Sequence, residues 1–132
     1  MVHFKIRKNL PLYISKLFPE LFGVRSYCDD EEFIVLIYET NTPVGCCLCQ
    51  AEDPVIDKEG NIKINIKINR FEIRKSRQRK GYGTQLFNWV VIKFNVHKVS
   101  LLYLDDNAKK FWKAMGFRKE NEHSDWLYKI IK

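Results

Sequence analysis

Hydrophobic and polar residues alternate over residues 2–7, and two short apolar runs joined by a turn follow in the first half of the chain; both patterns predict β-strands. The strands predicted there span residues 2–7, 31–39 and 44–52. Between the first two, residues 10–23 predict a helix that is broken near Pro19. A turn over 40–45 joins the second and third strands into a hairpin, and a polar loop over 53–60 follows them.

The next segment changes the phase of its alternation. Isoleucines occupy the even positions from 62 to 68, whereas the following apolar residues, Phe71 and Ile73, are odd-numbered. One extra residue in the strand explains this shift, so we expect a β-bulge near Asn69 or Arg70. The alternative is a strand that ends at 68. Bulges often lie beside active sites, because they re-aim the chain and leave backbone groups unpaired.

The second half of the chain predicts a helix, a strand, a second helix and a closing pair of strands. These elements span 82–97, 98–104 and 105–115, with the closing strands at Phe117 and over 126–131. Asp105 is a suitable N-cap for the second helix, and Gly116 is a suitable terminator. The order of elements is typical of one α/β (α+β) domain, which accounts for the whole chain of 132 residues.

The charge of this domain indicates which class of partner it favours. The formal net charge is +7 and the isoelectric point is about 9.3, which favours polyanionic partners. Residues 67–80 alone hold seven Lys or Arg and one Glu, so the positive charge is concentrated there.

No apolar run reaches the roughly 20 residues of a membrane span, and the start of the chain lacks a secretory pattern. We therefore expect a cytoplasmic protein, with the nucleus as the alternative, and no membrane partner.

Three of the four cysteines lie within one apolar segment. The four are Cys28, Cys46, Cys47 and Cys49. Zinc sites usually present paired ligands across a turn, and the sequence has no second cluster with that spacing. We therefore expect the three neighbours to be small buried hydrophobic residues of a strand, and we expect no metal.

Residues 78–84, QRKGYGT, lie between a predicted strand and a predicted helix. A helix start exposes unpaired N–H groups and the positive end of the helix dipole, and the two glycines of this segment let an anion approach. Basic neighbours and the hydroxyl of Thr84 add donors. The segment therefore indicates a diphosphate site, with an ordinary tight turn as the alternative. Leu86 stands where the dinucleotide fingerprint needs its third glycine, and the lysine of the nucleoside triphosphate loop is missing.

Two motifs together resemble the GNAT N-acetyltransferase superfamily. The first is Q-x-x-G-x-G from Gln78 to Gly83, and the second, about thirty residues later, is A-x-x-F-W-x-x-x-G-F from Ala108 to Phe117. The match is good over 62–119, and the residues of the motifs are most similar to those of the histone acetyltransferase branch. The resemblance implies acetyl-CoA as cosubstrate. It also implies a mixed, mostly antiparallel sheet with a bulged, splayed central strand and helices on both faces.

The resemblance further implies which residues bind acetyl-CoA. The backbone of 71–73 would pair with the pantetheine arm, residues 78–84 would hold the pyrophosphate, and residues 103–106 would flank the acetyl end. Trp112 would pack beside the thioester, whereas Phe111 on the same helical stripe is expected in the core. The expected cofactor-binding residues are Phe71, Glu72, Ile73, Gln78, Arg79, Lys80, Gly81, Tyr82, Gly83, Thr84, Tyr103, Asp105, Asp106 and Trp112.

Acetyl transfer to an amine needs a base for the amine, a stabilised carbonyl oxygen and a proton for the leaving thiolate. Two positions depart from the family pattern. Trp112 stands where many members have a tyrosine, and Lys67 stands where the histone acetyltransferase branch has a glutamate base. Glu72 is the candidate base, with an ion pair to a flanking arginine as the alternative role. Tyr103 is a candidate acid.

The leading hypothesis is an N-acetyltransferase that acts on a primary amine. The acceptor is a protein lysine or N-terminus, a small amine, or an aminoacyl-tRNA. Similarity to the histone acetyltransferase branch favours a lysine, whereas the charge of +7 fits an RNA-bound or acidic substrate. The alternative is a non-catalytic acyl-CoA-binding or nucleic-acid-binding module, motivated by Lys67 and Trp112. The sequence is also compatible with a homodimer.

Overall fold

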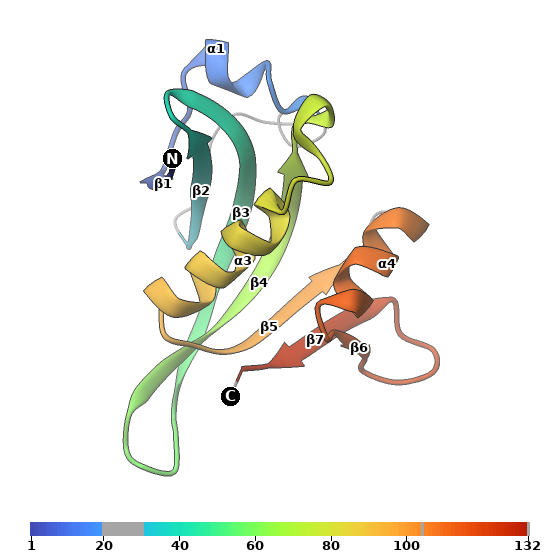
Figure 1. Cartoon of the computed structure of the whole chain (residues 1–132). Coiled ribbons are helices and arrows are strands. Elements are labelled where there is room, and N and C mark those ends of the chain that lie inside the picture. The colour runs from blue at the N-terminus through green and yellow to red at the C-terminus, as the bar shows by residue number, and fades with distance from the viewer. Residues whose placement is uncertain (20–30, 104, 132) are drawn as a thin grey trace.

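A computed structural model describes residues 1–19, 31–103 and 105–131. Its centre is a seven-stranded sheet with the strand order β1-β2-β3-β4-β5-β7-β6 (Figure 1). Neighbouring strands pair antiparallel, except for β4 and β5, which are parallel. The strands are β1 (Val2–Arg7), β2 (Glu32–Glu39), β3 (Thr42–Ile56), β4 (Ile62–Ile73), β5 (Val96–Leu102), β6 (Arg118–Lys119) and β7 (Trp126–Ile130). The predicted mixed, mostly antiparallel sheet is confirmed.

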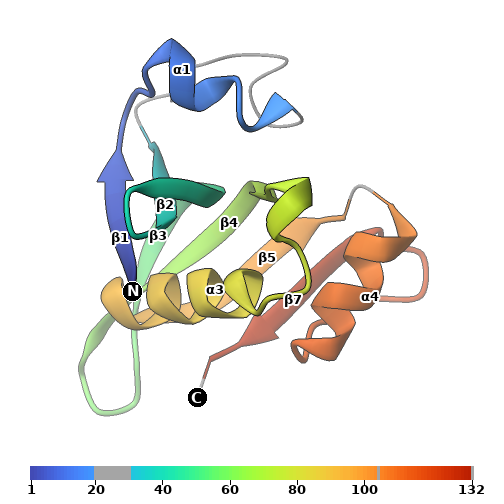
Figure 2. The ribbon, with the colours of Figure 1, turned by 45° about the horizontal axis from the view of Figure 1, so that its top comes forward.

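Helices cover both faces of this sheet, as predicted (Figures 1 and 2). They are α1 (Leu12–Ser15), the 3-10 turn η1 (Lys75–Arg77), α3 (Tyr82–Lys93) and α4 (Asp106–Ala114). One core joins α3 and α4 to the sheet, and a second, smaller core lies on the face covered by α1. Within the described residues, no helix is long and apolar enough to cross a membrane.

The predicted bulge is present in β4. Leu48 of β3 pairs with Arg70, and the next residue of β3, Cys49, pairs with Ile68, so Asn69 is the extra residue. The Asn69 side chain donates hydrogen bonds to Glu32 Oε2 at 2.7 Å and to Gln50 Oε1 at 3.1 Å. Because of this insertion, even-numbered apolar residues before it and odd-numbered ones after it pack into the same core.

The predicted splay lies between β4 and β5. Their parallel pairing ends at the pair of Ile68 and Leu101. Beyond that pair β4 continues to Ile73 beside β3, whereas β5 ends at Leu102. Figure 1 shows the two strands diverging at this point. The second half of β4 therefore presents an open edge toward α4.

Two predicted boundaries in the centre of the chain are wrong. The first half of the loop predicted over 53–60 is strand, because β3 runs on to Ile56 and pairs with the start of β4. Backbone pairing across this long hairpin decides the conformation despite the polar side chains. The helix predicted to reach His97 ends at Lys93, since Asn95 adopts a left-handed conformation with φ of 49°. The following strand accordingly starts at Val96 rather than at residue 98.

The ends of the chain also differ from the prediction in detail. The helix predicted over 10–23 is only four residues long in α1, and turns at 16–17 interrupt it before Pro19. Residues 20–23 of that prediction lie outside the described residues. The hairpin turn predicted over 40–45 is reduced to Thr40 and Asn41. The closing strand predicted at Phe117 starts one residue later, with Phe117 buried in the core.

The clustered cysteines occupy the positions expected of small hydrophobic residues. Cys46, Cys47 and Cys49 are buried in β3, whereas Cys28 lies outside the described residues. Burial raises the pKa of the Cys46 and Cys47 thiols well above the usual value, so both are protonated at neutral pH. In the part of the chain that the structure describes, no three His, Cys, Asp or Glu side chains gather as a metal site would require.

Candidate active site

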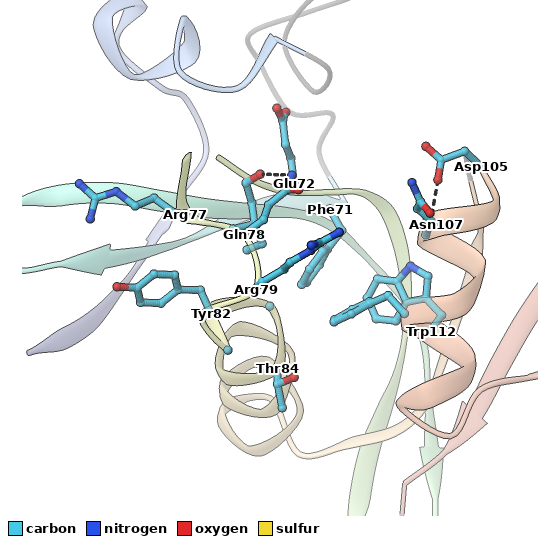
Figure 3. A pocket seen from close by; sticks show the side chains of 15 residues that line it. Phe71, Glu72, Arg77, Gln78, Arg79, Tyr82, Thr84, Asp105, Asn107 and Trp112 are labelled. Carbon is cyan, nitrogen blue, oxygen red and sulfur yellow. Dashed lines mark hydrogen bonds between the residues drawn. The ribbon is translucent and has the colours of Figure 1, made fainter. Parts of the chain in front are cut away.

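A groove of about 760 Å³ opens where β4 separates from β5. Its walls come from the end of β4, the loop before α3, the first turn of α3 and the first two turns of α4 (Figure 3). The lining residues are Phe71, Glu72, Ile73, Arg77, Gln78, Arg79, Gly81, Tyr82, Gly83, Thr84, Asp105, Asn107, Ala108, Phe111 and Trp112. Segments 71–73 and 78–84, which the sequence analysis singled out separately, therefore meet at one site.

The start of α3 forms one wall of the groove. Gly81 is the N-cap residue, with φ of 83°, and it has no side chain that could accept a hydrogen bond from the first turn. Arg79 also adopts a left-handed backbone, with φ of 63°. The first N–H groups of a helix have no acceptor within the helix, so here they are left for a ligand. This wall has the geometry and charge of an anion site.

The start of α4 forms the opposite wall and is built differently. Asp105 is its N-cap, and one of its carboxylate oxygens accepts a hydrogen bond from the N–H of Ala108 at 2.8 Å (Figure 3). The first turn adds a second carboxylate, Asp106. The predicted capping role of Asp105 is confirmed. The protein itself satisfies this helix start, which makes it a poor place for a phosphate.

Gly83 has a packing role that the sequence did not indicate. A Cβ atom at this position would lie 3.1 Å from Phe111 Cζ and 3.5 Å from Phe71 Cε1. The glycine therefore lets the first turn of α3 rest against two aromatic rings of the groove floor. Phe111, which was expected in the core alone, is half-buried and lines the groove. Any side chain at Gly83 would displace the rings before it met a phosphate.

Trp112 anchors the aromatic floor of the groove. Only 4% of its surface is exposed, and its ring packs edge-on against Phe71, Phe87, Phe111 and Phe117 at centroid distances of 4.9 to 5.9 Å. The residue belongs both to the core and to the lining of the groove. Its indole N–H replaces a phenol at this position, so the floor has no acid here.

Glu72 lies at the edge of the groove, with its side chain on the α1 side of the sheet. Figure 3 shows its carboxylate directed toward α1, while Phe71 beside it points toward the aromatic floor. On the neighbouring strand its partner is Cys46, and the Glu72 charge adds to burial in raising the pKa of that thiol. A carboxylate at this edge borders both the groove and the α1 side of the sheet.

The two arginines that flank Glu72 have backbone partners. Arg70 Nη1 donates to the carbonyl oxygen of Asn69 at 2.8 Å, and Arg74 Nη1 donates to that of Pro43 at 3.3 Å. These contacts hold the guanidinium groups along the strand.

The basic loop divides its side chains between structure and groove. Gln78 Nε2 donates to the carbonyl oxygen of Ile73 at 3.1 Å, which ties the loop to the end of β4. Figure 3 shows Arg79 extending toward the α4 side of the groove, whereas Arg77 and Tyr82 point the other way. Arg77 was not predicted as a site residue, although it belongs to the basic run that marked the loop. Asn107 was also missed, because nothing in the sequence distinguishes it from other first-turn residues.

Tyr82 contributes its backbone side to the groove and its hydroxyl to the sheet. The hydroxyl donates to Glu39 Oε2 at 3.2 Å. Hydrogen bonds from the amino group of Met1 and from Tyr82 lower the pKa of Glu39 below its usual value. Partial burial and the nearby Glu39 charge raise the pKa of Tyr82, so its hydroxyl keeps its proton and stays a donor at neutral pH.

Three predicted residues lie outside the lining of this groove: Lys80, Tyr103 and Asp106. Tyr103 lines a separate cavity of about 40 Å³ near the point where β4 and β5 part. Phe71 and Trp112 border both spaces, so Tyr103 is separated from the groove by their rings. The Lys109 ammonium lies 5.2 Å from the centroid of the Tyr103 ring.

A seven-stranded sheet splayed at a parallel pair, with an uncapped glycine-rich helix start beside the opening, defines an acyl-CoA-type transferase site. The family comparison agrees with this geometry: residues 7–117 match the acetyltransferase (GNAT) family. The chain belongs to the GNAT family, whose members are N-acetyltransferases that use acetyl-CoA.

Individual relatives are distant. A protein of Lactobacillus delbrueckii subsp. lactis, described as an uncharacterized N-acetyltransferase in the pepI 3′ region, is 32% identical over 78 residues, or 55% of this chain. That match spans 42% of the relative, which is less than half its length. Two solved structures share the fold over 98% of this chain. They are Arabidopsis thaliana Naa50 in complex with the bisubstrate analogue CoA-Ac-MVNAL (21% identical, 99% of that chain, TM-score 0.67) and AtaT complexed with acetyl-methionyl-tRNAfMet (14% identical, 95% of that chain, TM-score 0.63).

Proposed function

We propose that this chain transfers the acetyl group of acetyl-CoA to a primary amine. The observation that carries the proposal is the start of α3, where a glycine N-cap leaves backbone N–H groups without a side-chain acceptor beside a basic loop. A diphosphate suits such a site because it accepts several hydrogen bonds and carries negative charge. The groove of about 760 Å³ leads from this site along the open edge of β4.

The groove residues divide the work of binding. The backbone of 71–73 would pair with the pantetheine arm along the open edge of β4, and residues 78–84 would hold the pyrophosphate. Asp105, Asp106 and Tyr103 would border the acetyl end, with Trp112 as the floor. Bound acetyl-CoA supplies an acetyl thioester, which is an activated acyl donor. The protein's part is to fix its position and to exclude water from the aromatic floor.

Proton transfer is assigned to two side chains. Glu72 borders the groove from the α1 side, and we infer that it takes the proton of the attacking amine, directly or through water. Tyr103 is the candidate donor to the leaving thiolate, and it would have to act through the small cavity behind Phe71. A lysine at position 67 and a tryptophan at 112 support the competing function of a non-catalytic acyl-CoA-binding module.

The acceptor is a primary amine on a protein, a small molecule or an aminoacyl-tRNA. The sequence resemblance to the histone acetyltransferase branch supports a protein lysine. The structural relatives support two other acceptors, since Naa50 is bound to a CoA-peptide analogue and AtaT to acetyl-methionyl-tRNAfMet. Substrate selection lies outside the cofactor groove, on the surfaces around Glu72.

Thiol release from acetyl-CoA tests the proposed activity. The acceptor panel contains peptides with a free or a blocked N-terminus, a lysine peptide, a polyamine and aminoacyl-tRNA. We expect thiol release above the acceptor-free rate with at least one of them. Measurable acetyl-CoA binding without turnover on any acceptor would replace the transferase by the binding module.

Glu72→Gln tests the base within the same assay. The variant should lower turnover near neutral pH and leave acetyl-CoA affinity largely intact, because the amide keeps the shape but cannot accept a proton. Glu59→Gln in the exposed β3–β4 turn is the matched control. Wild-type turnover in Glu72→Gln would remove this residue as the base.

A further inference from the structure

The side of the sheet opposite α3 and α4 carries a second group of lysine and aromatic side chains. Residues that pair directly across neighbouring strands share one face, so Lys67 of β4, Ser100 of β5 and Tyr128 of β7 lie side by side. Figures 1 and 2 show α1 over the β1 to β3 end of the sheet, away from β5 and β7. We call the remaining area the open sheet face, defined by Lys63, Lys67, Lys98, Leu102, Trp126 and Tyr128.

Aromatic rings and lysines alternate on the open sheet face. The Lys67 ammonium lies 5.6 Å from the centroid of the Trp126 ring, and that of Lys98 lies 5.2 Å from the Tyr128 ring. All four side chains are half-buried, so the rings remain accessible beside their cations. Leu102, whose backbone pairs with Trp126, is 50% exposed. Apolar and aromatic side chains grouped on one partly exposed face favour a contact surface.

The charge of this face is positive. Lys63 and Lys98 lie 3.9 Å from the carboxylates of Asp57 and Glu120, at the limit of an ion pair. Pairs at this distance are weak, most of all the more exposed pair of Lys98 and Glu120, and they are readily exchanged for another anion. In the part of the chain that the structure describes, the contact found for the Lys67 ammonium is the Trp126 ring, with no carboxylate opposing it.

We propose that the open sheet face binds single-stranded RNA and presents an amine at the RNA end to the acetyltransferase site. Trp126 and Tyr128, two residues apart on one strand, are separated by about 7 Å along it, so neighbouring bases of an extended strand can stack one on each ring. The lysines beside the rings then contact the phosphates. A base stacked on a ring outweighs an exposed cation–π pair, so RNA displaces the lysines from the rings.

The position of the face connects it to the acetyl end of the groove. The pair of Lys67 and Ser100 directly precedes the pair of Ile68 and Leu101, where β4 and β5 part. The cavity of about 40 Å³ at this point is lined by Leu102 of the open sheet face and by Trp112 of the groove floor. The end of a strand bound on the open sheet face therefore lies at the splay, where only the rings of Phe71 and Trp112 separate it from the groove. This step rests on the proposed function, whereas RNA binding itself does not.

Binding of a fluorescent single-stranded oligoribonucleotide of about 12 nucleotides, followed by anisotropy at several salt concentrations, tests the surface. Lys98→Ala should weaken binding and lower the slope of log K against log salt by about 0.7, the value for one phosphate contact on a single strand. Lys113→Ala removes the same charge from the exposed side of α4, over the other face, and should leave the slope unchanged. Equal changes in the two variants would reduce the effect to net charge and overturn the proposal.

Trp126→Ala should weaken RNA binding about tenfold, and Trp126→Phe should restore most of it because a ring remains for stacking. Wild-type acetyl-CoA affinity in both variants shows that the fold is kept, since Trp126 does not line the groove. Wild-type RNA affinity in Trp126→Ala, or binding to anionic phosphatidylserine vesicles without RNA binding, would overturn the proposal.

The failures of the two proposals are distinguishable. RNA binding that depends on Lys98 and Trp126, without turnover on aminoacyl-tRNA or any other acceptor, keeps the surface and rejects the transferase. Thiol release with a peptide or polyamine, in a protein that does not bind RNA, keeps the transferase and rejects the surface.

Discussion

Two helices start at the same groove and treat their first N–H groups in opposite ways. The α3 start has a glycine N-cap with φ of 83° and basic residues before it, whereas the α4 start has Asp105 in an extended conformation, with its carboxylate bound to the Ala108 N–H. Both carry the same backbone dipole. The comparison shows that the N-cap residue decides how a helix start can be used. A glycine leaves the first N–H groups for an anion, whereas an aspartate accepts a hydrogen bond from them itself.

The largest effect is expected from Gly81→Asp, which gives α3 the acidic start of α4. A carboxylate at the groove should lower acetyl-CoA affinity at least about tenfold, or about 1.4 kcal/mol, because it repels the diphosphate and competes for the same N–H groups. Titration calorimetry measures this. Gly81 is a cleaner position than Gly83, where any side chain would collide with the Phe111 ring.

Gly81→Asn is the control for backbone strain, because asparagine carries the same shape at the same positive φ without the charge. Its affinity loss should be clearly smaller than that of Gly81→Asp. Equal losses in the two variants would assign the effect to shape, and undiminished affinity in a folded Gly81→Asp protein would move the diphosphate away from α3.

A smaller effect is expected when the cap of α4 is removed. Asp105→Ala should lower the free energy of unfolding by about 1 kcal/mol, because the Ala108 N–H loses its acceptor. Acetyl-CoA affinity should hardly change. Urea denaturation measures the stability, and Asp105→Asn, which keeps a capping oxygen, should stay close to wild type. If Asp105→Ala lost affinity and kept stability, the roles of the two helix starts would be reversed.

The smallest effect is expected from Tyr82→Phe. Its hydroxyl donates to Glu39 on the sheet and points away from the groove. Loss of this long, part-buried hydrogen bond should change both acetyl-CoA affinity and stability by less than about 0.5 kcal/mol. A larger loss of affinity, measured by the same calorimetry, would place the Tyr82 hydroxyl at the bound ligand.

The sequence predicted those parts of the molecule in which local chemistry and tertiary contacts agree. The bulge followed from the period-2 pattern, and the cap of α4 followed from an aspartate before an apolar helical stripe. The strand over 53–56 was missed because backbone pairing with β4 overrides its polar side chains. The second role of Gly83 was hidden as well, since the ring that it accommodates comes from Phe111, 28 positions later.

Within the site, the sequence motifs indicated which segments lie near the groove but not where their side chains point. Segment 78–84 lines the groove except for Lys80, yet Gln78 is bonded to Ile73 and Tyr82 is turned toward the sheet. Side-chain direction depends on packing that a motif does not encode. The open sheet face was missed for a related reason: its lysines and aromatic residues come from three strands that only the topology brings together.

Asn69 determines which face of the sheet the following residues of β4 occupy. Every residue of β4 after it owes its side of the sheet to that one inserted position, which the hydrogen bonds to Glu32 and Gln50 hold in place. If Asn69 were paired as an ordinary strand residue, with no bulge, Phe71 and Ile73 would exchange faces with Glu72, and a carboxylate would enter the larger core. Deletion of Asn69 would instead give a regular alternation that keeps these faces, with loss of the hydrogen bonds to Glu32 and Gln50.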